Sequence, residues 1–539
     1  MAQQKSVGQI SIKAATELNA REKVAARMTT DGYDGLIGIK LRGNSSLGFA
    51  QKKYTLETWD ADAAERQVSL LGMPAHSDWV LLAPYNDVSM LRDPLAFQLW
   101  REMGHWAPRT RFVELTFNGD YRGIYILAEA IKQGADRVNI SRMTTTDTCG
   151  RNLTGGYLLR IDTFNEDDAT FTSSVPGIGE GSMTSEVIWS CIYPKKKKLM
   201  PEQLEYIQSF VDTVEQVIQS DLFADRQNGY ASYIDVPSFV DYFIHTELSL
   251  NADGYKRSAY FYKERQRPDG SGGRLVAGPV WDYNLAYGNC NFANANNLEA
   301  WCFKGASNNP TPAMWQRLLQ DPAFRKAVKK RYFELRKNVL SNKSINAYIE
   351  RQAQLLSEAA NRHFAVYPEL LVSEEQKQQL ADQRQQMGAP PFGGFPGMSG
   401  GFPPQGGFPG MGGGFPGAFP PQMGGGFSGG FPGMGVPPFG AFPRMGGFPG
   451  MGGFPRMGEF SPQMGEIPEG GFPDMSGFQF DAVGMFAAYR VSSYDEEIQT
   501  LKQWLADRLA FLDANIDRFD SDWQPLIQPL VEKKMQFPW

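Results

Sequence analysis

The sequence predicts an α+β fold, in which a strand-rich first part of the chain is followed by a helical second part. Three observations predict it. Up to about residue 190, short runs of β-branched and aromatic residues alternate with polar turns. From residue 201 onward, apolar residues recur at helical spacing. At about residue 387 the composition changes to repeats of Gly, Phe, Pro and Met, and a helical pattern returns near residue 495.

The predicted strands form pairs around polar turns. The turn at residues 43–46 separates two apolar runs, and Asn118-Gly119 separates two others, which is a strong hairpin signal. A third, shorter pair lies within the helical part of the chain. The predicted pairs join residues 36–41 with 53–58, 112–117 with 121–127, and 258–263 with 274–279.

The predicted helices follow from apolar residues that repeat every three or four positions. After residue 495 these residues include Leu501, Trp504, Leu505 and Leu509, which lie on or near one helical face. The predicted helices cover residues 89–103, 202–219, 236–251, 322–339, 344–386 and 495–517.

Residues 387–477 repeat Gly-Phe-Pro-Gly-Met with variations. Because Gly is entropically unfavourable to order and Pro removes a hydrogen-bond donor, we expect neither helix nor sheet here and predict disorder. Two interpretations stay open. The segment is either a tether without specific function, or a segment that self-associates or coats a partner through its regularly spaced Phe and Met side chains.

The bulk composition bounds the class of protein. The 539 residues carry a formal net charge of −6, which does not suit a protein that binds nucleic acid, and the basic run at residues 195–198 is predicted to be a solvated loop. No apolar run approaches the roughly 18 residues that span a bilayer. The first residues lack the apolar core of a signal sequence. We therefore expect either a cytoplasmic protein or the mature form of an exported one.

Four cysteines occur, Cys149, Cys191, Cys290 and Cys302, and none of them has Cys-x-x-Cys spacing, so a zinc ribbon is not predicted. Two disulfides and four free thiols are both compatible with this number. The four histidines also lack metal-ligand spacing, and the glycine-rich phosphate-loop signature is absent.

Cations and hydroxyls gather around the first predicted hairpin turn. Arg42 and Lys53 lie on neighbouring strands, and Ser45 and Ser46 lie in the turn between them. A hairpin places such cations side by side, and the turn adds backbone N–H groups, so this arrangement can hold a triphosphate. The alternative is a solvated basic hairpin without a ligand.

Two acids follow predicted elements in the second part of the chain. Asp253 comes after a long apolar helix, and Asp282 follows a short strand. An acid at a helix exit and another at a strand exit can meet at one metal ion, to which Asn251 and Asn284 would add oxygen ligands. Taken singly, each acid also suits an ordinary turn or helix terminus.

Taken in order, five stretches of the sequence resemble the CotH family, the spore-coat-protein-H type of secreted, protein-kinase-like enzymes. The resemblance runs over about residues 35–325 and resumes near residues 501–517. The five stretches are residues 39–46 with 52–54, 86–93, 118–129, 251–255 and 281–284.

This resemblance implies a divergent two-lobed protein-kinase fold. It implies phosphoryl transfer from ATP, with Mg²⁺ or Mn²⁺, to a Ser or Thr hydroxyl of an exported protein, and hence an extracellular or cell-surface location. The implied nucleotide-binding residues are Arg42, Ser45, Ser46, Lys53 and Glu129, the implied metal ligands are Asp282, Asn251 and Asn284, and the implied catalytic residue is Asp253. Residues 1–386 and 478–539 would then form one domain, interrupted by the insertion at 387–477.

Two positions depart from the family pattern. Ser258 stands where protein kinases usually place a metal-binding Asn, and Asn284 stands where many CotH sequences have Asp. Because both changes weaken a metal site, a second hypothesis stays open. It is a non-catalytic pseudokinase at a surface or coat, which binds partners and self-associates through residues 387–477.

Other charged residues in or near the matching stretches each have more than one possible role. Glu114 and Glu129 are both candidates for an ion pair with Lys53 that would order the strand-rich part. Arg92 and Asp93 match a family motif on a predicted helix, either as catalytic groups or as a structural ion pair.

Overall fold

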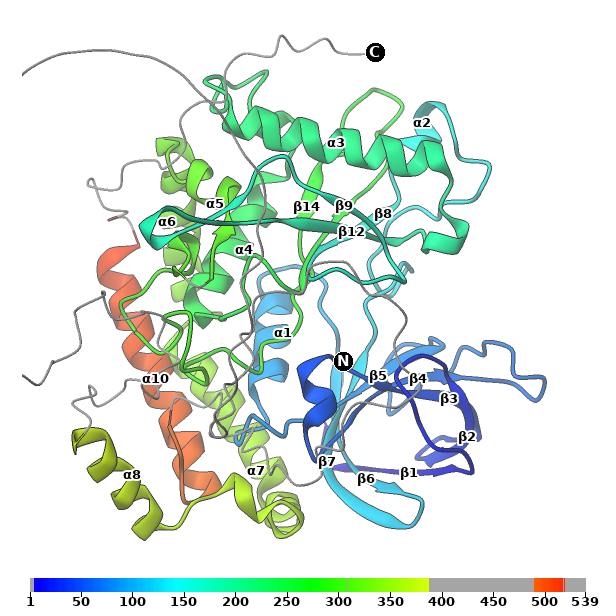
Figure 1. The fold of residues 1–539 in the computed structure, drawn as a ribbon, viewed down its shortest axis with the longest axis vertical. Helices are drawn as coiled ribbons and strands as arrows, with labels where there is room; N and C mark the ends of the chain where they lie inside the picture. Colours follow the sequence, from blue (N-terminus) through cyan, green and yellow to red (C-terminus); the bar gives the residue numbers. More distant parts are fainter. Residues whose placement is uncertain (1–3, 308, 387–488, 517, 519–539) are drawn as a thin grey trace, which may run out of the picture. The chain divides into compact units, whose positions relative to one another are not determined.

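The computed structural model describes residues 4–307, 309–386, 489–516 and 518, all of which belong to one compact unit. Within these residues the chain is mixed α/β, with strands concentrated in the N-terminal part and helices toward the C-terminal part (Figure 1). This confirms the predicted order of elements. The predicted disorder of residues 387–477 concerns a segment outside the described residues. None of the described helices is both long and apolar enough to cross a membrane.

The first seven strands form a closed barrel, which the sequence did not predict (Figure 1). The hairpin predicted around residues 43–46 is confirmed by the antiparallel pairing of β3 and β4, and the hairpin at Asn118-Gly119 by that of β6 and β7. The barrel closes because β1 pairs in parallel with β6. The strands are β1 (Gly8–Ala14), β2 (Val24–Thr30), β3 (Tyr33–Arg42), β4 (Lys53–Thr58), β5 (Asp78–Leu82), β6 (Thr110–Phe117) and β7 (Asp120–Glu129), in the order β1-β2-β3-β4-β5-β7-β6.

Alternation along the barrel strands separates two apolar cores. On β7, Tyr125 and Leu127 point into the barrel, whereas Ile124 and Ile126 pack against the rest of the unit. On β4, Tyr54 and Leu56 are inside, so Lys53 lies on the outer side of the sheet. Lys53 therefore faces away from the barrel interior.

Two further sheets follow the barrel. One five-stranded antiparallel sheet has the order β14-β13-β8-β12-β9, and its β13–β14 pair confirms the third predicted hairpin. A small sheet has the order β11-β10-β15. The strands are β8 (Tyr157–Ile161), β9 (Ala169–Thr172), β10 (Gly177–Gly179), β11 (Met183–Ser185), β12 (Ile188–Tyr193), β13 (Ala259–Lys263), β14 (Leu275–Ala277) and β15 (Thr311–Pro312).

The predicted helices are confirmed to within a few residues, with one exception. The helix predicted over residues 344–386 is two helices, because Pro368 lacks a backbone N–H and disfavours helical geometry at Tyr367, which precedes it. The described helices are α1 (Arg92–Glu102), α2 (Gly150–Leu153), α3 (Pro201–Gln219), α4 (Val236–Ser249), α5 (Ala313–Leu318), α6 (Pro322–Arg336), α7 (Asn342–Val366), α8 (Glu374–Gln386) and α10 (Tyr494–Asn515).

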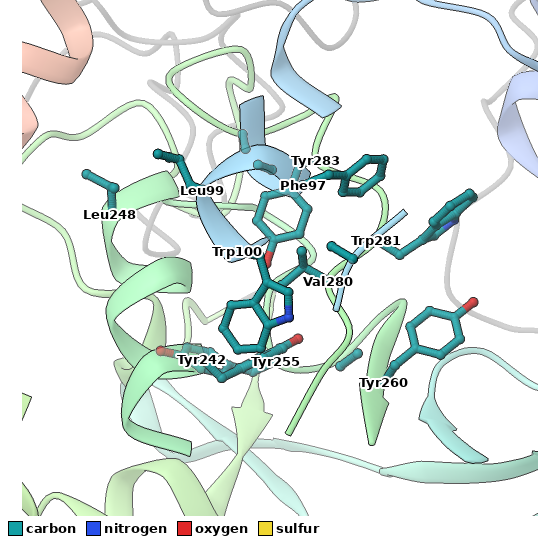
Figure 2. Close-up of a cluster of buried hydrophobic side chains, with 14 of the residues drawn as sticks. Phe97, Leu99, Trp100, Tyr242, Leu248, Tyr255, Tyr260, Val280, Trp281 and Tyr283 are labelled. Atoms are coloured by element: carbon teal, nitrogen blue, oxygen red, sulfur yellow. The ribbon is translucent and has the colours of Figure 1, made fainter. Parts of the chain in front are cut away.

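Helix α4 runs through the main core (Figure 2). It begins at the N-cap Asp235, whose side chain accepts a hydrogen bond from the Ser238 backbone N–H. Tyr242 on α4 packs edge-on against Trp100 of α1, with ring centroids 5.9 Å apart. Aromatic packing of this kind fixes α1 and α4 against each other. Helix α1 begins beside the turn that carries Asp282, and α4 ends just before Asp253.

Helix α7 joins the barrel to the helical part through His363. The Nδ1 of this side chain accepts a hydrogen bond of 3.0 Å from the Ile124 backbone N–H on β7. The neighbouring Gly123 has φ +80, and a Cβ there would lie 2.5 Å from the same nitrogen, so only glycine fits. Burial lowers the pKa of His363 to about 3, which keeps the imidazole neutral as an acceptor.

His363 should make the stability of the fold depend on pH. The unfolded chain protonates this group below its ordinary value of 6.5, whereas the folded chain does not until about pH 3. The contribution of His363 to the free energy of unfolding is therefore complete above pH 6.5 and is lost as the pH falls. Compared with His363→Asn, which keeps an acceptor but cannot titrate, the wild type should lose about 1.4 kcal/mol of unfolding free energy per pH unit below pH 6. Urea unfolding of both proteins at pH 7, 6 and 5 measures this loss. The same pH dependence of the unfolding free energy in the two proteins would contradict a neutral, buried His363.

Candidate active site

The β3–β4 hairpin carries the two predicted phosphate-binding cations. Arg42 and Lys53 are paired across the last position of the ladder, so their side chains are neighbours. Gly43 begins the turn with φ +119, and a Cβ there would lie 2.0 Å from the Oγ of Ser46. Glycine is therefore required, and it lets the backbone fold closely around the buried Ser46. Ser45 begins the short 3₁₀ turn Ser45–Gly48 that follows.

The loop between the two cations is anchored by two residues just before β4. The Nζ of Lys52 donates a 2.6 Å hydrogen bond to the Leu47 carbonyl, and Nε2 of Gln51 donates one of 2.8 Å to the Ile124 carbonyl on β7. Burial lowers the pKa of Lys52. These contacts hold Lys52 in the scaffold and leave Lys53 as the cation that faces the helical part.

The turn after β14 meets this hairpin. The guanidinium of Arg42 lies 5.3 Å from the ring centroid of Trp281, which in turn stacks on Phe97 of α1 with centroids 5.6 Å apart. The next residue, Asp282, has its Oδ1 3.9 Å from the Nζ of Lys53. The Asp282 side chain is 38% exposed and that of Lys53 11%, so the carboxylate keeps a face open for a ligand. The structure thus brings together Arg42, Lys53 and Asp282.

The backbone at Asp282 is held in an unusual conformation. Its φ is +65, which is uncommon for a residue other than glycine but tolerated by Asp and Asn. Directly after it, the Tyr283 N–H donates a 2.6 Å hydrogen bond to the buried Asp93 carboxylate at the start of α1. Burial first, and then the charge of Asp282, raise the pKa of Asp93 to about 7. Asp93 is therefore a buried anchor for the turn that presents Asp282.

The exit of α4 presents Asn251 and Asp253 on the other side of Asp282. The helix ends at Leu250 with φ +44, which turns the chain sharply. Nδ2 of Asn251 donates a 3.3 Å hydrogen bond to the Asp282 carbonyl, and its Oδ1 accepts one of 3.2 Å from the Asp253 N–H. Asn251 thereby links the two predicted acids through their backbones.

Asp253 lies in a largely buried setting beside a cation. Its Oδ1 lies 3.5 Å from the guanidinium of Arg257, and 19% of its side chain is exposed. Burial raises its pKa, the positive charges of Arg257 and Lys256 oppose this, and the charge of Asp282 adds to the increase. The charge of Asp282 therefore acts on Asp253, and a shared metal ion between the two acids stays a prediction.

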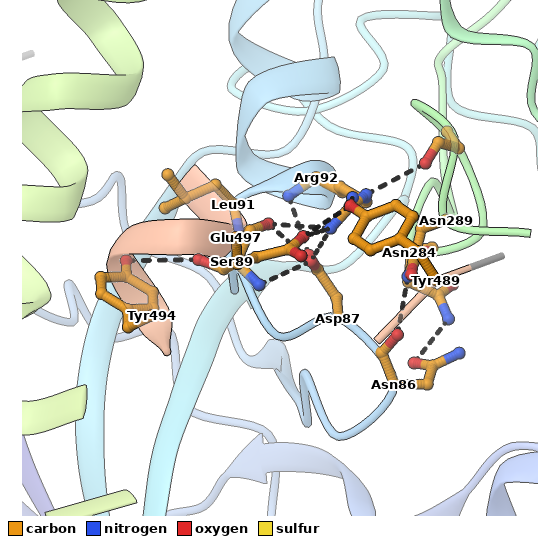
Figure 3. A network of polar contacts seen from close by, with 11 residues as sticks. Asn86, Asp87, Ser89, Leu91, Arg92, Asn284, Asn289, Tyr489, Tyr494 and Glu497 are labelled. Carbon is orange, nitrogen blue, oxygen red and sulfur yellow. Dashed lines mark hydrogen bonds and ion pairs between the residues drawn. The ribbon is translucent and has the colours of Figure 1, made fainter. Parts of the chain in front are cut away.

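Asn284 is engaged in a network of side-chain amides (Figure 3). Its Nδ2 donates a 2.9 Å hydrogen bond to Oδ1 of Asn86, and Nδ2 of Asn289 donates to the carbonyls of both Asn86 and Asn284. The amide of Asn284 is thus partly committed to holding its own turn. A role as metal ligand would fall on its remaining oxygen.

Beside this network, Arg92 is fully buried and joins the site to α10 (Figure 3). Its guanidinium contacts the Asp87 carboxylate and donates 2.7 Å hydrogen bonds to Glu497 and to the Tyr489 hydroxyl. Its Nε donates to the Ala286 carbonyl at 3.1 Å. The matching motif therefore serves as a structural ion pair, which was one of the two predicted roles of Arg92.

A second buried pair ties α10 to the end of α4. Arg508 donates hydrogen bonds of 3.0 and 2.6 Å to the Glu247 carbonyl and one of 2.9 Å to the Ala300 carbonyl. The Glu247 carboxylate accepts from the Tyr255 hydroxyl and from backbone N–H groups of the following loop. Burial raises the pKa of Glu247 to about 7 and lowers that of Arg508 to about 10. Arg508 thus fixes the helix end from which Asn251 and Asp253 emerge.

Sequence reasoning missed these supports. Glu497 and Arg508 lie on an amphipathic helix among other charged residues and give no local sign of burial. The available signal was that Arg508 falls within the stretch near residues 501–517 that resembles the closing helix of the family. Charged side chains are almost never fully buried unless they are paired. A charged residue among the apolar positions of a helix therefore indicates a buried partner.

The predicted partners of Lys53 need correction. Glu129 is fully buried with Arg109 and Arg137, at 2.7 and 2.6 Å. It stands opposite Trp79, on the inner side of the barrel sheet, whereas Lys53 is on the outer side. Glu114 forms its ion pair with Arg362 of α7. Neither glutamate pairs with Lys53, and the carboxylate that does is Asp282.

The oxygen groups near Asp282 suit a hard metal ion only in part. Within the described residues, no group of three or more His, Cys, Asp or Glu side chains is arranged to hold a metal ion. Mg²⁺ is, however, usually held by one or two carboxylates together with substrate phosphates. Asp282 provides one such carboxylate, and Asn251 lies beside it, so the donors fit a nucleotide-bound Mg²⁺ better than a free ion.

Comparisons with known proteins show which family the chain belongs to. Residues 39–387, more than half of the chain, match the CotH kinase protein family. The inner spore coat protein H of Bacillus subtilis (strain 168) is 21% identical over 254 residues, which are 47% of this chain and 59% of that protein. The matched family segment contains the hairpin cations, the α4 exit and the Asp282 turn. The chain therefore belongs to the CotH kinase protein family.

Proposed function

We propose that the protein transfers the γ-phosphoryl group of ATP, with Mg²⁺, to a Ser or Thr hydroxyl of an exported or surface protein. The observation that carries this proposal is the 3.9 Å approach of Lys53 on the barrel to Asp282 on the turn after β14. A cation for phosphate and a carboxylate for metal, brought together from distant parts of the chain, are two of the requirements for phosphoryl transfer.

The barrel and the helical part would then correspond to the two lobes of a divergent protein kinase. The barrel supplies Arg42, Lys53 and the 43–46 turn, and the helical part supplies Asp253 and Asp282. In this proposal the closed barrel replaces the open sheet that a kinase N-terminal lobe would have.

Each residue has a distinct role in the proposed reaction. Arg42 and Lys53 neutralise phosphate oxygens, and Ser46 with the turn backbone adds donors. Asp282 and Asn251 would hold the metal, which when bound neutralises charge on the phosphates. Asp253 accepts the hydrogen bond of the acceptor hydroxyl and takes its proton as the oxygen attacks.

A binding protein without catalysis is the second candidate. The observation in its favour concerns position 284. The side chain there is a neutral Asn, which brings no charge to the metal, and its Nδ2 is held by Asn86. Such a protein would bind partners at a surface or coat, with residues 387–477 available for self-association. The coat assignment of the relative from Bacillus subtilis supports such a location for either candidate.

Asp282→Asn tests the proposed metal role without straining the backbone, since Asn tolerates φ +65 where Ala would not. Removing the charge of a direct ligand should weaken Mg²⁺-dependent ATP binding by about 10–100-fold, while ATP binding in EDTA stays unchanged. Calorimetric titration with and without Mg²⁺ measures both. Asp269→Asn, in an exposed turn, is the matched control. Equal Mg²⁺ dependence in the Asp282 and Asp269 variants would refute the assignment.

A further inference from the structure

A small cavity lies behind the loop that follows α4. Its volume is about 20 Å³, which is room for one water molecule or one monatomic ion. The walls are mixed, with apolar parts from residues such as Leu250 and Trp301 and polar parts from residues such as Asn309, and Lys256 is a charged residue in the lining. The cavity therefore combines a single-atom size with a cationic side chain.

The ammonium group of Lys256 is buried and has no hydrogen-bond partner within the described part of the chain. Burial lowers its pKa to about 8, so the group is still mostly charged at neutral pH. An isolated charge inside a protein is strongly unfavourable unless a counter-charge lies beside it. The structure thus requires an explanation for how this charge is balanced.

The charge of Asp253 acts on Lys256 and opposes the effect of burial on its pKa, but it does so without an ion pair. Asp253 lies 3.5 Å from Arg257, and Asp282 lies 3.9 Å from Lys53, so each of these carboxylates has its own cation. No carboxylate is recorded within ion-pair distance of Lys256 among the described residues. Burial raises the pKa of the Cys302 thiol that lines the cavity, which keeps it neutral. Among the described residues, the ammonium group of Lys256 therefore has Asp253 as a more distant counter-charge but no hydrogen-bond acceptor of its own.

We propose that this cavity is a site for a monatomic halide, filled by chloride, with Lys256 as its charged ligand. A halide matches the size of the cavity, and it accepts hydrogen bonds, which the buried ammonium group of Lys256 otherwise lacks among the described residues. The site lies against Asn251 and Ala252, so the bound ion would hold the loop that carries Asp253. This inference rests on the cavity and the charges, and not on the proposed phosphoryl transfer.

Thermal unfolding at constant ionic strength tests the site. Chloride or bromide in place of gluconate, which is too large for the cavity, should raise the melting temperature of the wild type by about 2 °C or more. Lys256→Met should show no halide-specific increase, and in gluconate it should be at least as stable as the wild type because it removes an unpaired buried charge. Lys198→Met, on an exposed lysine, should respond like the wild type.

Bromide gives a second readout that does not depend on any variant. Crystals of the wild type in bromide, at the midpoint concentration of the thermal titration, should show an anomalous peak beside the Nζ of Lys256. An identical halide response in Lys256→Met would overturn the proposal, as would the absence of that peak. If Lys256→Met does not fold, the bromide peak decides alone. Neither readout uses ATP, so a failed site is distinguishable from a failed kinase assignment.

Discussion

Asp253→Asn is expected to slow phosphoryl transfer by about 10²–10⁴-fold while Mg-ATP binds with unchanged affinity. The reason is the division of labour in the proposed site. Lys53 and Asp282 contact each other on the donor side, whereas Asp253 emerges from the α4 exit beside Arg257. Asn keeps the shape and the backbone hydrogen bond to Asn251, but it cannot take the hydroxyl proton.

The measurement is autophosphorylation with labelled ATP, together with transfer to a Ser-rich basic protein and a separate ATP-binding titration. Asp167→Asn, an exposed acid in the loop before β9, is the control and should retain full rate. A wild type that transfers nothing in Mg²⁺ is retested in Mn²⁺. Binding without transfer in both metals would favour the non-catalytic candidate, and a fully active Asp253→Asn would eliminate the catalytic assignment.

Arg508→Leu is expected to lower the free energy of unfolding by about 3–5 kcal/mol, because it leaves the buried Glu247 without its cation. Arg508 and Glu247 are both completely buried, with their charged groups 3.7 Å apart. The change also removes donors from the carbonyls of Glu247 and Ala300. Unsatisfied buried acceptors add to the loss.

Lys502→Leu on the same helix is the matched control for this prediction. Its ion pair is with Glu350, whose side chain is 60% exposed, so the loss should be within about 1 kcal/mol. Urea unfolding followed by tryptophan fluorescence compares the two variants. A loss for Arg508→Leu no larger than that for Lys502→Leu would show that α10 does not brace the end of α4.

Local chemistry explains which parts of this structure the sequence could predict. The hairpin at 43–46 and the pairing of Arg42 with Lys53 depend on neighbouring residues, and both are present. Closure of the barrel depends on β1 meeting β6, a long-range pairing that alternation along one strand does not encode. The meeting of Lys53 with Asp282 was expected only through the resemblance to a family.

The misassignment of Glu129 has a similar cause. Charge and position in a motif suggested a partner for Lys53, but the face of a strand on which a residue lies is decided by the register of the whole barrel. Glu129 aligns with Trp79 and meets Arg109 and Arg137 instead. The position of Asn251 and Asp253 just after a helix was easier to predict, because the apolar pattern of α4 ends locally at this point of the sequence.

The position of α10 in the chain has a consequence for synthesis of the protein. Glu497 follows its partner Arg92 by 405 residues, and Arg508 follows Glu247 by 261. At about 5–20 residues per second, a ribosome takes roughly 20–80 s to make the stretch between Arg92 and Glu497. In the later part of that interval, after residue 284 has been made, the nascent chain carries every proposed phosphate and metal ligand, but not the residues that brace them. In the proposed function, phosphoryl transfer would begin only once residues 497–508 have left the ribosome, so an unfinished chain would not modify the proteins around it.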